Sequence, residues 1–318
     1  RSKVFMQIAA EAEQDLRDLM GIPENYKVLF VQGGGTLQFA MVAMNLLKDG
    51  TACYVETGTW SKKAIAEAKK YGNVKVVASS KDKNFTYIPD CSDLPIRENA
   101  DYVYICENET IHGTTFQQLP NTKGKILVSD QSSMFLSKPC NVEDYGLIWA
   151  GVQKNVGPAG MAVVIVREDL LDYAEEKMPT MLEWKTMAEN GSMYNTPPTY
   201  AIYVCMCVLE WVKAQGGLTA MAERNYAKAK LLYDYLDASA LFNPTVMGED
   251  RSIMNVPFVT GNPDLDAAFV KQATAAGLVN LKGHRSVGGM RASIYNAMDM
   301  AGVEKLVNFM KDFEKANK

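Results

Sequence analysis

The chain has 318 residues, about twice the length of a ~150-residue domain, so we expect two domains. Apolar residues make up 47% of the chain and charged residues 22%, a composition typical of folded globular proteins that argues against extensive disorder. Lys and Arg number 33 against 37 Asp and Glu, and the net charge of −4 comes without a long basic run. Because nucleic acid and anionic membranes attract basic surfaces, we expect neither as a partner.

No stretch approaches the ~20 consecutive apolar residues of a membrane-spanning helix, and the chain does not open on a secretion signal. We therefore expect a cytoplasmic protein. Its cysteines are Cys53, Cys91, Cys106, Cys140, Cys205 and Cys207. They form no C-x-x-C pair that could hold zinc, so reduced thiols are the simplest interpretation and we expect no metal site.

The first two thirds of the chain alternate helix-like stretches with short apolar runs. Residues 5–20 carry apolar side chains at helical spacing, up to a Gly-Ile-Pro stop. An apolar run at 28–31 then ends at three glycines, residues 33–35, and a buried helix is predicted at 39–47. Further strands are predicted at 74–78, 102–106, 126–129, 147–150 and 162–166. Because these strands are apolar throughout rather than alternating, they predict an α/β fold with a mostly parallel sheet covered on both faces.

The pattern changes after two prolines at 197–198. Helices are predicted at 201–214, 218–236, 264–276 and 303–315, and strands at 252–259 and 290–295. This mixture predicts a smaller C-terminal α+β domain. We place the division between residues 1–218 and 219–318.

The glycines at 33–35 lie between a predicted strand and a predicted helix. Glycine lets a backbone approach a phosphate, and a helix N-terminus offers free N–H groups to it. A dinucleotide fingerprint would need a glycine at Gln38, and no P-loop Gly-Lys-Ser/Thr follows. The run fits a mononucleotide, a phosphorylated cofactor or an ordinary strand-to-helix turn.

Two charged residues follow predicted buried strands. Asp130 comes directly after the strand at 126–129, and Lys154 shortly after the strand at 147–150. Ligands gather at the carboxyl ends of strands in open α/β sheets, so both side chains could reach one rim. An aspartate for a ring nitrogen and a Schiff-base lysine are the two groups that pyridoxal phosphate requires. A solvated surface lysine is the alternative.

Seven segments stand in chain order: residues 33–35, 57–60, 108–113, 129–133, 150–160, 191–199 and 282–293. Together they resemble the phosphoserine aminotransferase family, pyridoxal-phosphate enzymes of fold type I, over essentially the whole chain. The most specific segments are Gln-Lys-Asn-Val-Gly-Pro-Ala-Gly at 153–160 and Lys-Gly-His-Arg at 282–285. The resemblance implies ping-pong transamination between L-glutamate and 3-phosphohydroxypyruvate, giving O-phospho-L-serine and 2-oxoglutarate in serine biosynthesis.

The resemblance also implies roles for individual residues. Lys154 would be the catalytic residue and would hold pyridoxal 5'-phosphate as a Schiff base, while Asp130 would pair with the ring nitrogen. Trp60 would stack on the ring, and Thr110 would bond the ring oxygen. The phosphate of the cofactor would lie against three further residues, namely Gly35, Thr36 and Gln153.

Asn195 and Thr196 of a partner subunit would complete the phosphate site, so the resemblance implies a homodimer with composite active sites. Arg291 would clamp the substrate α-carboxylate, since a guanidinium binds a carboxylate through two parallel hydrogen bonds. His284 and Arg285 would bind the substrate's phosphate or the distal carboxylate of glutamate.

Two features depart from the family pattern. Thr36 stands where the family commonly has an arginine that helps to bind the anionic group of the substrate. The chain also begins at Arg1, whereas the family carries a further segment of about forty residues ending in a His-Arg-Ser turn. Arg1 would reach a neighbouring active site. An inactive truncated dimer is therefore one alternative.

Two more alternatives belong to other function classes. One is a different pyridoxal-phosphate reaction, such as transamination of another small keto acid, a desulfurase reaction or a lyase reaction. The other is a protein without cofactor that acts through its dimer surface. Hydrolysis has little support, because there is no Gly-x-Ser-x-Gly and neither His112 nor His284 lies in an H-E-x-x-H pattern.

Overall fold

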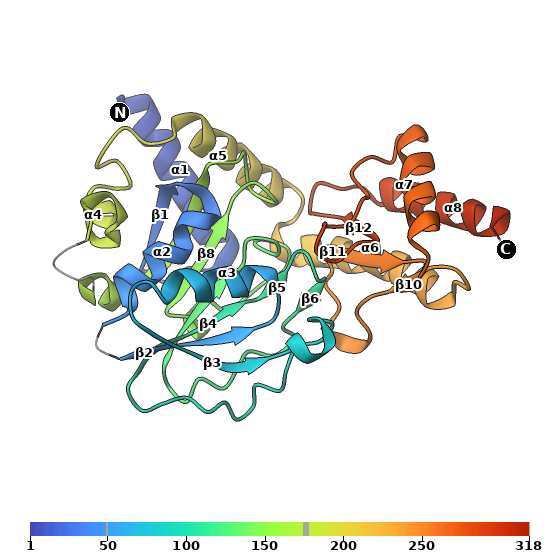
Figure 1. The fold of residues 1–318 in the computed structure, drawn as a ribbon. Coiled ribbons are helices and arrows are strands. Elements are labelled where there is room, and N and C mark those ends of the chain that lie inside the picture. The colour runs from blue at the N-terminus through green and yellow to red at the C-terminus, as the bar shows by residue number, and fades with distance from the viewer. Residues whose placement is uncertain (49, 174–177, 318) are drawn as a thin grey trace.

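The computed structural model describes residues 1–48, 50–173 and 178–317. Its centre is a seven-stranded sheet of order β1-β9-β8-β7-β4-β2-β3 (Figure 1). The strands are β1 (Tyr26–Gln32), β2 (Thr51–Glu56), β3 (Asn73–Ser79), β4 (Ala100–Cys106), β7 (Ile126–Asp130), β8 (Leu147–Gly151) and β9 (Met161–Arg167). Neighbours from β8 to β3 pair parallel, and β9 runs antiparallel to both β1 and β8. The prediction of an α/β fold with a mostly parallel sheet is confirmed.

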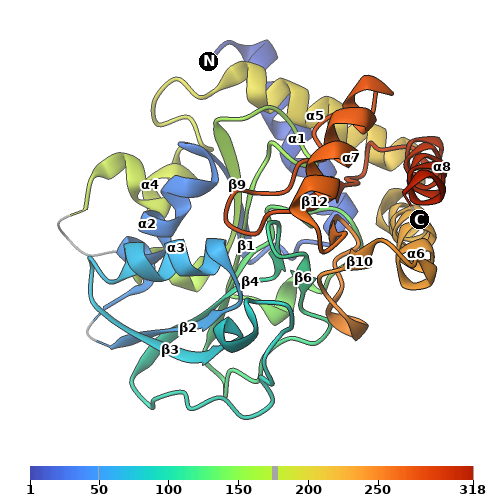
Figure 2. The same cartoon turned by 45° about the vertical axis from the view of Figure 1, so that its right-hand side comes forward.

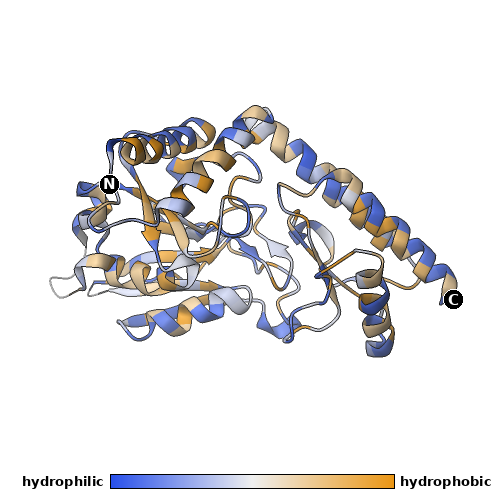
Figure 3. Cartoon of the chain, turned by 90° about the horizontal axis from the view of Figure 1, so that it is seen from above, coloured by the Kyte–Doolittle hydropathy of each residue, from blue (hydrophilic) through white to orange (hydrophobic). Residues whose placement is uncertain are grey.

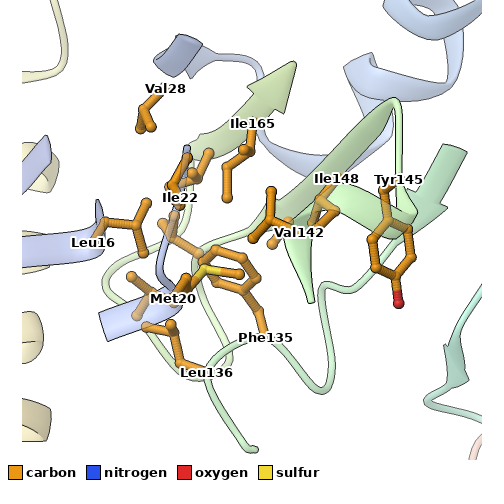
Figure 4. Close-up of a cluster of buried hydrophobic side chains, with 14 of the residues drawn as sticks. Leu16, Met20, Ile22, Val28, Phe135, Leu136, Val142, Tyr145, Ile148 and Ile165 are labelled. Atoms are coloured by element: carbon orange, nitrogen blue, oxygen red, sulfur yellow. The ribbon is translucent and has the colours of Figure 1, made fainter. Parts of the chain in front are cut away.

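Helices cover both faces of this sheet (Figures 1 and 2). One face carries α1 (Lys3–Met20) and α5 (Thr199–Ala214), and the other carries α2 (Gly34–Leu46), α3 (Thr59–Ala68) and α4 (Trp184–Glu189). Successive strand residues point to opposite faces, so Cys53 belongs to the core cluster that includes α1 and α5, while Tyr54 belongs to the cluster that includes α2 and α3. Burial on both faces explains why the strands are apolar throughout. Figure 4 shows part of the core beside α1, where Leu16 lies near Phe135.

The C-terminal part is built on a small antiparallel sheet of β10 (Asn243–Pro244), β11 (Asn255–Val259) and β12 (Met290–Ser293). Its helices are α6 (Gly217–Ala238), α7 (Pro263–Ala275) and α8 (Met300–Ala316). Figure 3 shows α8 with apolar and polar residues interleaved, as expected for a helix that buries one side. The buried side packs into a cluster centred on three aromatic rings, Phe242, Phe258 and Phe269.

Helix α6 takes part in two core clusters. Leu218 and Met221 at its start pack with the large sheet, whereas Leu232 and Leu236 near its end pack with the C-terminal sheet. The division that we predict between residues 218 and 219 falls in the first turn of this helix, and it stays a prediction.

The remaining elements are short. They are the strand pair β5 (Asn108–Glu109) and β6 (Thr114–Thr115) and the 3-10 turns η1 (Lys81–Lys83), η2 (Val142–Asp144), η3 (Glu168–Tyr173), η4 (Thr180–Leu182) and η5 (Gly248–Asp250). Over the described ranges, no helix is long and apolar enough to cross a bilayer. The same residues contain no group of three or more His, Cys, Asp or Glu arranged for a metal ion.

Candidate active site

A cavity opens where three neighbouring strands of the large sheet end. Cys106 is the last residue of β4, Asp130 is the last of β7, and Lys154 lies in the turn that follows β8. The cavity is lined by Gly35, Thr36, Phe39, Trp60, Cys106, Asn108, Thr110, Asp130, Ser132, Ser133, Trp149, Gln153 and Lys154. The fold therefore brings together Lys154 and six further residues for which the resemblance implies cofactor binding.

The amine of Lys154 is held inside this cavity. Its Nζ donates a hydrogen bond to Thr110 Oγ1 at 2.7 Å and lies 5.8 Å from the ring centroid of Trp60. Burial lowers the pKa of Lys154, and the nearby Asp130 carboxylate works against that shift. The lowered pKa gives the side chain more of the neutral amine that can act as a nucleophile or base.

One carboxylate oxygen of Asp130 accepts two close hydrogen bonds, whereas the other has only a long contact with a thiol. The side chain is only 5% exposed, and Oδ1 accepts hydrogen bonds from the backbone N–H and the hydroxyl of Ser132, at 2.9 and 2.6 Å. At Oδ2, the donor among the described residues is the Cys106 thiol, 3.9 Å away. Burial raises the pKa of Asp130, while Ser132 and the Lys154 ammonium lower it. A cationic N–H directed at Oδ2 would stabilise the carboxylate.

The indole of Trp60 is held by the start of α3. The buried Glu109 carboxylate accepts hydrogen bonds from the backbone N–H groups of Trp60 (3.2 Å) and Ser61 (2.9 Å) and from the Ser61 hydroxyl (2.7 Å). A carboxylate at a helix N-terminus satisfies free N–H groups and fixes the first turn. The indole Nε1 itself is buried without a hydrogen-bond partner in the described structure.

The other end of the cavity is too narrow for side chains. A Cβ on Gly35 would lie 3.2 Å from the Trp149 ring, and one on Gly151 would lie 2.8 Å from Gln153 Oε1 and 3.3 Å from the Gly35 backbone nitrogen. The first turn of α2 and the Gln153 amide therefore converge on a small space. Free N–H groups at a helix N-terminus attract anions, so this end suits a phosphate.

These groups fit pyridoxal 5'-phosphate. An open carboxylate oxygen faces a lysine with a lowered pKa, a hydroxyl and an indole lie beside them, and amide donors lie at the far end. In that order, these groups match the ring nitrogen, the aldehyde carbon, the ring oxygen, the ring face and the phosphate of the cofactor.

Arg291 approaches from the C-terminal sheet. Its Nη1 donates to the backbone oxygen of Thr110 at 3.2 Å, while its Nε is buried without a partner in the structure as described. His284 and Arg285 lie in the surface turn before β12, where His284 Nδ1 lies 2.7 Å from the Ser286 hydroxyl. Neither lines the Lys154 cavity. The pKa of His284 is lowered mainly by burial and further by the nearby Arg291 guanidinium.

Arg1, Asn195 and Thr196 lie together but away from Lys154. Gln32 Nε2 donates to Asn195 Oδ1 at 3.1 Å and to the Thr196 carbonyl at 3.4 Å. Arg1 Nη1 donates to the backbone oxygens of residues 193 and 194 at 2.9 and 3.3 Å. None of the three lines the cavity of the same chain.

Six residues that line the cavity were not among the predicted site residues. They are Phe39, Cys106, Asn108, Ser132, Ser133 and Trp149. Two signals were present for some of them: the serines lie in the matching segment 129–133, and Cys106 ends a predicted strand in the same way as Asp130. Phe39 and Trp149 lie in segments predicted as buried helix and strand, so their types indicated only core packing.

Comparisons with known proteins agree with this geometry. The family model described as Aminotransferase class-V matches residues 1–306. The chain is 57% identical to a phosphoserine aminotransferase of Nitrosomonas europaea and 54% identical to one of Pseudomonas aeruginosa, over 99% of this chain and 88% of each relative.

Solved structures agree as well. A phosphoserine aminotransferase from Bacillus circulans subsp. alkalophilus superposes with a TM-score of 0.98 at 44% identity, covering 100% of this chain and 89% of that one. A pyridoxal-phosphate-bound phosphoserine aminotransferase from Trichomonas vaginalis gives a TM-score of 0.93 at 41% identity, covering 98% and 89%.

Proposed function

The chain belongs to the phosphoserine aminotransferase family of the class-V aminotransferases, and on that premise we propose that it transfers the amino group of L-glutamate to 3-phosphohydroxypyruvate. The products are 2-oxoglutarate and O-phospho-L-serine, which places the enzyme in serine biosynthesis. The observation that carries the proposal is the Lys154 amine, held 2.7 Å from Thr110 Oγ1 at the rim where the buried Asp130 ends β7. Both substrates use this one cavity in turn, so the kinetics are ping-pong.

The cofactor is pyridoxal 5'-phosphate, which when bound supplies an electron sink and carries the amino group between the two substrates. Lys154 would hold it, Asp130 Oδ2 would accept a hydrogen bond from its ring nitrogen, and Thr110 would bond its ring oxygen. Trp60 would cover one face of the ring and exclude water. Its phosphate would be bound by Gly35, Thr36 and Gln153.

The lysine amine also moves the substrate proton. Because burial lowers the pKa of Lys154, its Nζ can accept the proton from the substrate Cα and later return a proton to the product. The hydrogen bond to Thr110 keeps this amine inside the cavity. Proton transfer by one positioned group accounts for a rate factor of about 10² to 10⁴.

The substrate's carboxylate is bound by Arg291. Its buried Nε has no partner within the described chain, and a carboxylate that accepts from this nitrogen and from Nη would satisfy it. His284 and Arg285 would bind the phosphate of one substrate and the distal carboxylate of the other. Arg1 of a neighbouring chain would add a third cationic group where Thr36 supplies none.

We also propose a homodimer with composite sites. Beside Asn195 and Thr196, α1 and α5 leave large apolar side chains exposed, among them Val4 (72%), Tyr200 (71%) and Tyr203 (46%). Clustered exposed apolar groups are typical of protein interfaces. A second copy on this face would cover them and would bring Asn195 and Thr196 to the partner's phosphate end.

Two further proposals concern the whole chain. We assign it to the cytoplasm, because the six free thiols suit a reducing compartment. We also treat residues 1–218 and 219–318 as its two domains, in agreement with the separate core cluster around Phe242 and Phe269.

The decisive experiment follows both half-reactions on the purified protein loaded with cofactor. Glutamate should bleach the visible absorbance band, and 3-phosphohydroxypyruvate should restore it with formation of phosphoserine. If a non-phosphorylated keto acid restores the band with a higher kcat/KM, the substrate is another small keto acid. If glutamate leaves the band unchanged, the proposed transamination is wrong.

A further inference from the structure

Three consecutive backbone carbonyls in the loop after Asp130 accept hydrogen bonds from three different asparagines. The pairs are Phe135 with Asn155 at 3.0 Å, Leu136 with Asn296 at 2.8 Å, and Ser137 with Asn225 at 2.9 Å. The asparagines come from the turn after β8, the segment after β12 and helix α6. We call Asn155, Asn296 and Asn225 the asparagine cluster.

The members of the asparagine cluster are also bonded to one another. Asn155 Oδ1 accepts from the backbone N–H of Asn296 at 3.0 Å, and Asn296 Oδ1 accepts from Asn225 Nδ2 at 2.8 Å. Their side chains are 7%, 1% and 0% exposed. Because these amides are buried, no water can replace a lost hydrogen-bond partner, and breaking one of the bonds costs free energy.

The loop that the cluster holds has an unusual backbone. Leu136 has φ of 59°, a left-handed conformation that side chains other than glycine seldom adopt. Its side chain and that of Phe135 are buried in the core near Leu16 (Figure 4). The core thus fixes the side chains of this loop, and the asparagine cluster fixes its carbonyls.

Two members of the asparagine cluster lie next to groups of the proposed reaction. Asn155 directly follows Lys154, and Asn296 lies on the segment that continues from the strand of Arg291. That segment has a second anchor, because the buried Lys228 ammonium donates to three of its carbonyls. The acceptors are Ile294 at 3.0 Å, Tyr295 at 2.8 Å and Met298 at 2.9 Å.

We propose that Asn155 and Asn296 are positioning residues that set the distance between the Lys154 amine and the Arg291 guanidinium. This inference rests on the proposed function. A substrate whose carboxylate is bound by Arg291 reacts only if its Cα lies within proton-transfer reach of Lys154 Nζ. Because the two groups come from different sheets, a direct link between their segments is needed to hold that geometry, and the Asn155–Asn296 hydrogen bond supplies it.

The test compares three alanine variants of buried asparagines in the enzyme loaded with cofactor. Asn155→Ala removes the side-chain acceptor of the Asn296 backbone N–H and with it the direct link, whereas Asn225→Ala removes only the outer bond to Asn296. Asn45→Ala is the matched control, since Asn45 is 2% exposed, donates to Met41 O and Leu182 O and accepts from Trp184 N, but does not line the cavity. All three variants should unfold at lower temperature than the parent.

Only the cluster variants should change catalysis. We expect kcat with glutamate to fall about 100-fold in Asn155→Ala and about 10-fold in Asn225→Ala, and to stay unchanged in Asn45→Ala. The Kd of glutarate, a dicarboxylate without an amino group, should change less than about threefold because Arg291 is retained. Amide hydrogen exchange should rise at residues 294–298 in Asn155→Ala and not in Asn45→Ala.

The outcomes separate this inference from the proposed function. A parent enzyme that does not react with glutamate contradicts the proposed function, whatever the variants do. An active parent with a parental kcat in Asn155→Ala, and the same loss of thermal stability as in Asn45→Ala, makes the cluster merely structural and overturns the inference. If Asn155→Ala does not fold, a parental kcat in Asn225→Ala overturns it as well.

Discussion

The two sheets that contribute residues to the proposed site differ in how their polar groups are satisfied. On the side of the large sheet, Asp130, Glu109 and Lys154 have close hydrogen-bond partners within the chain. On the side of the C-terminal sheet, Arg291 has a buried Nε without a partner in the described residues, and His284 and Arg285 lie in a surface turn. The first side suits a group that stays bound and needs fixed geometry. The second suits carboxylates and phosphates that must enter and leave in every cycle.

The largest expected effect on turnover comes from a residue of the large sheet. Lys154→Ala should lower turnover by about 10⁴-fold, since it removes both the covalent attachment and the proton-transfer group. Stopped-flow absorbance with glutamate measures the loss. Lys63→Ala is the matched control, because the Lys63 amine also lies over the Trp60 ring, at 4.4 Å, and should leave kcat within about twofold. Retained bleaching in Lys154→Ala would contradict the assignment.

Asp130→Asn should lower kcat about 10²- to 10³-fold and weaken cofactor retention, because a neutral amide cannot stabilise a cationic ring N–H. Both effects are measured after gel filtration of the loaded enzyme. Glu107→Gln serves as control, since Glu107 is an equally buried carboxyl bonded to Ser129, Gln131 and Tyr145 but does not line the cavity. Equal losses in both variants would count against a special role for Asp130.

Substitutions on the C-terminal sheet should affect substrate binding rather than cofactor binding. Arg291→Lys should raise KM for glutamate roughly 10- to 100-fold, because a lysine cannot form two parallel hydrogen bonds to one carboxylate, a difference of about 1.5–3 kcal/mol. Cofactor retention should not change. Arg251→Lys, which breaks a two-bond pair with Asp237 at 2.8 and 2.6 Å away from the cavity, should leave KM unchanged. A loss of cofactor in Arg291→Lys would remove the distinction between the two sides.

The smallest effect concerns His112, which contacts Thr59 at the start of α3. Burial lowers its pKa to about 4, below the ordinary value of 6.5. Between these values the unfolded chain binds a proton and the folded chain does not, so stability falls as pH drops from about 6.5 towards about 4. After allowance for partial exposure, the loss is about 2 kcal/mol.

Urea unfolding at pH 5 and pH 7 measures this loss. His112→Gln should reduce the difference in unfolding free energy between the two pH values. His284→Gln, which removes the other, partly exposed histidine, should keep most of it. An unchanged difference in His112→Gln would show that other groups cause the acid sensitivity.

The sequence predicted those parts of the fold that have a local signal. Apolar runs located β1, β4 and β7 to within two residues at either end, since strands buried on both faces contain little else. Strand β2 was not predicted, because Thr-Ala-Cys-Tyr-Val-Glu contains few β-branched residues and its burial depends on its place between β4 and β3 in the sheet.

The site divides in a similar way. Asp130 and Lys154 could be predicted as a pair because each follows a strand of one sheet. Arg291, His284 and Arg285 carried no pattern of their own and came only from the resemblance. The Asn155–Asn296 bond could not be predicted at all, since it joins residues 141 positions apart and depends on how two sheets pack.

Helix α6 has a mechanical consequence beyond its packing. At 1.5 Å per residue its 22 residues form a rod about 33 Å long, with one end in each core cluster. A rotation of about 5° at its first turn displaces its last turn by about 3 Å over that length. Because Lys228 on this rod donates to the carbonyls of residues 294, 295 and 298, a tilt of the helix would carry the segment that follows the Arg291 strand along with it.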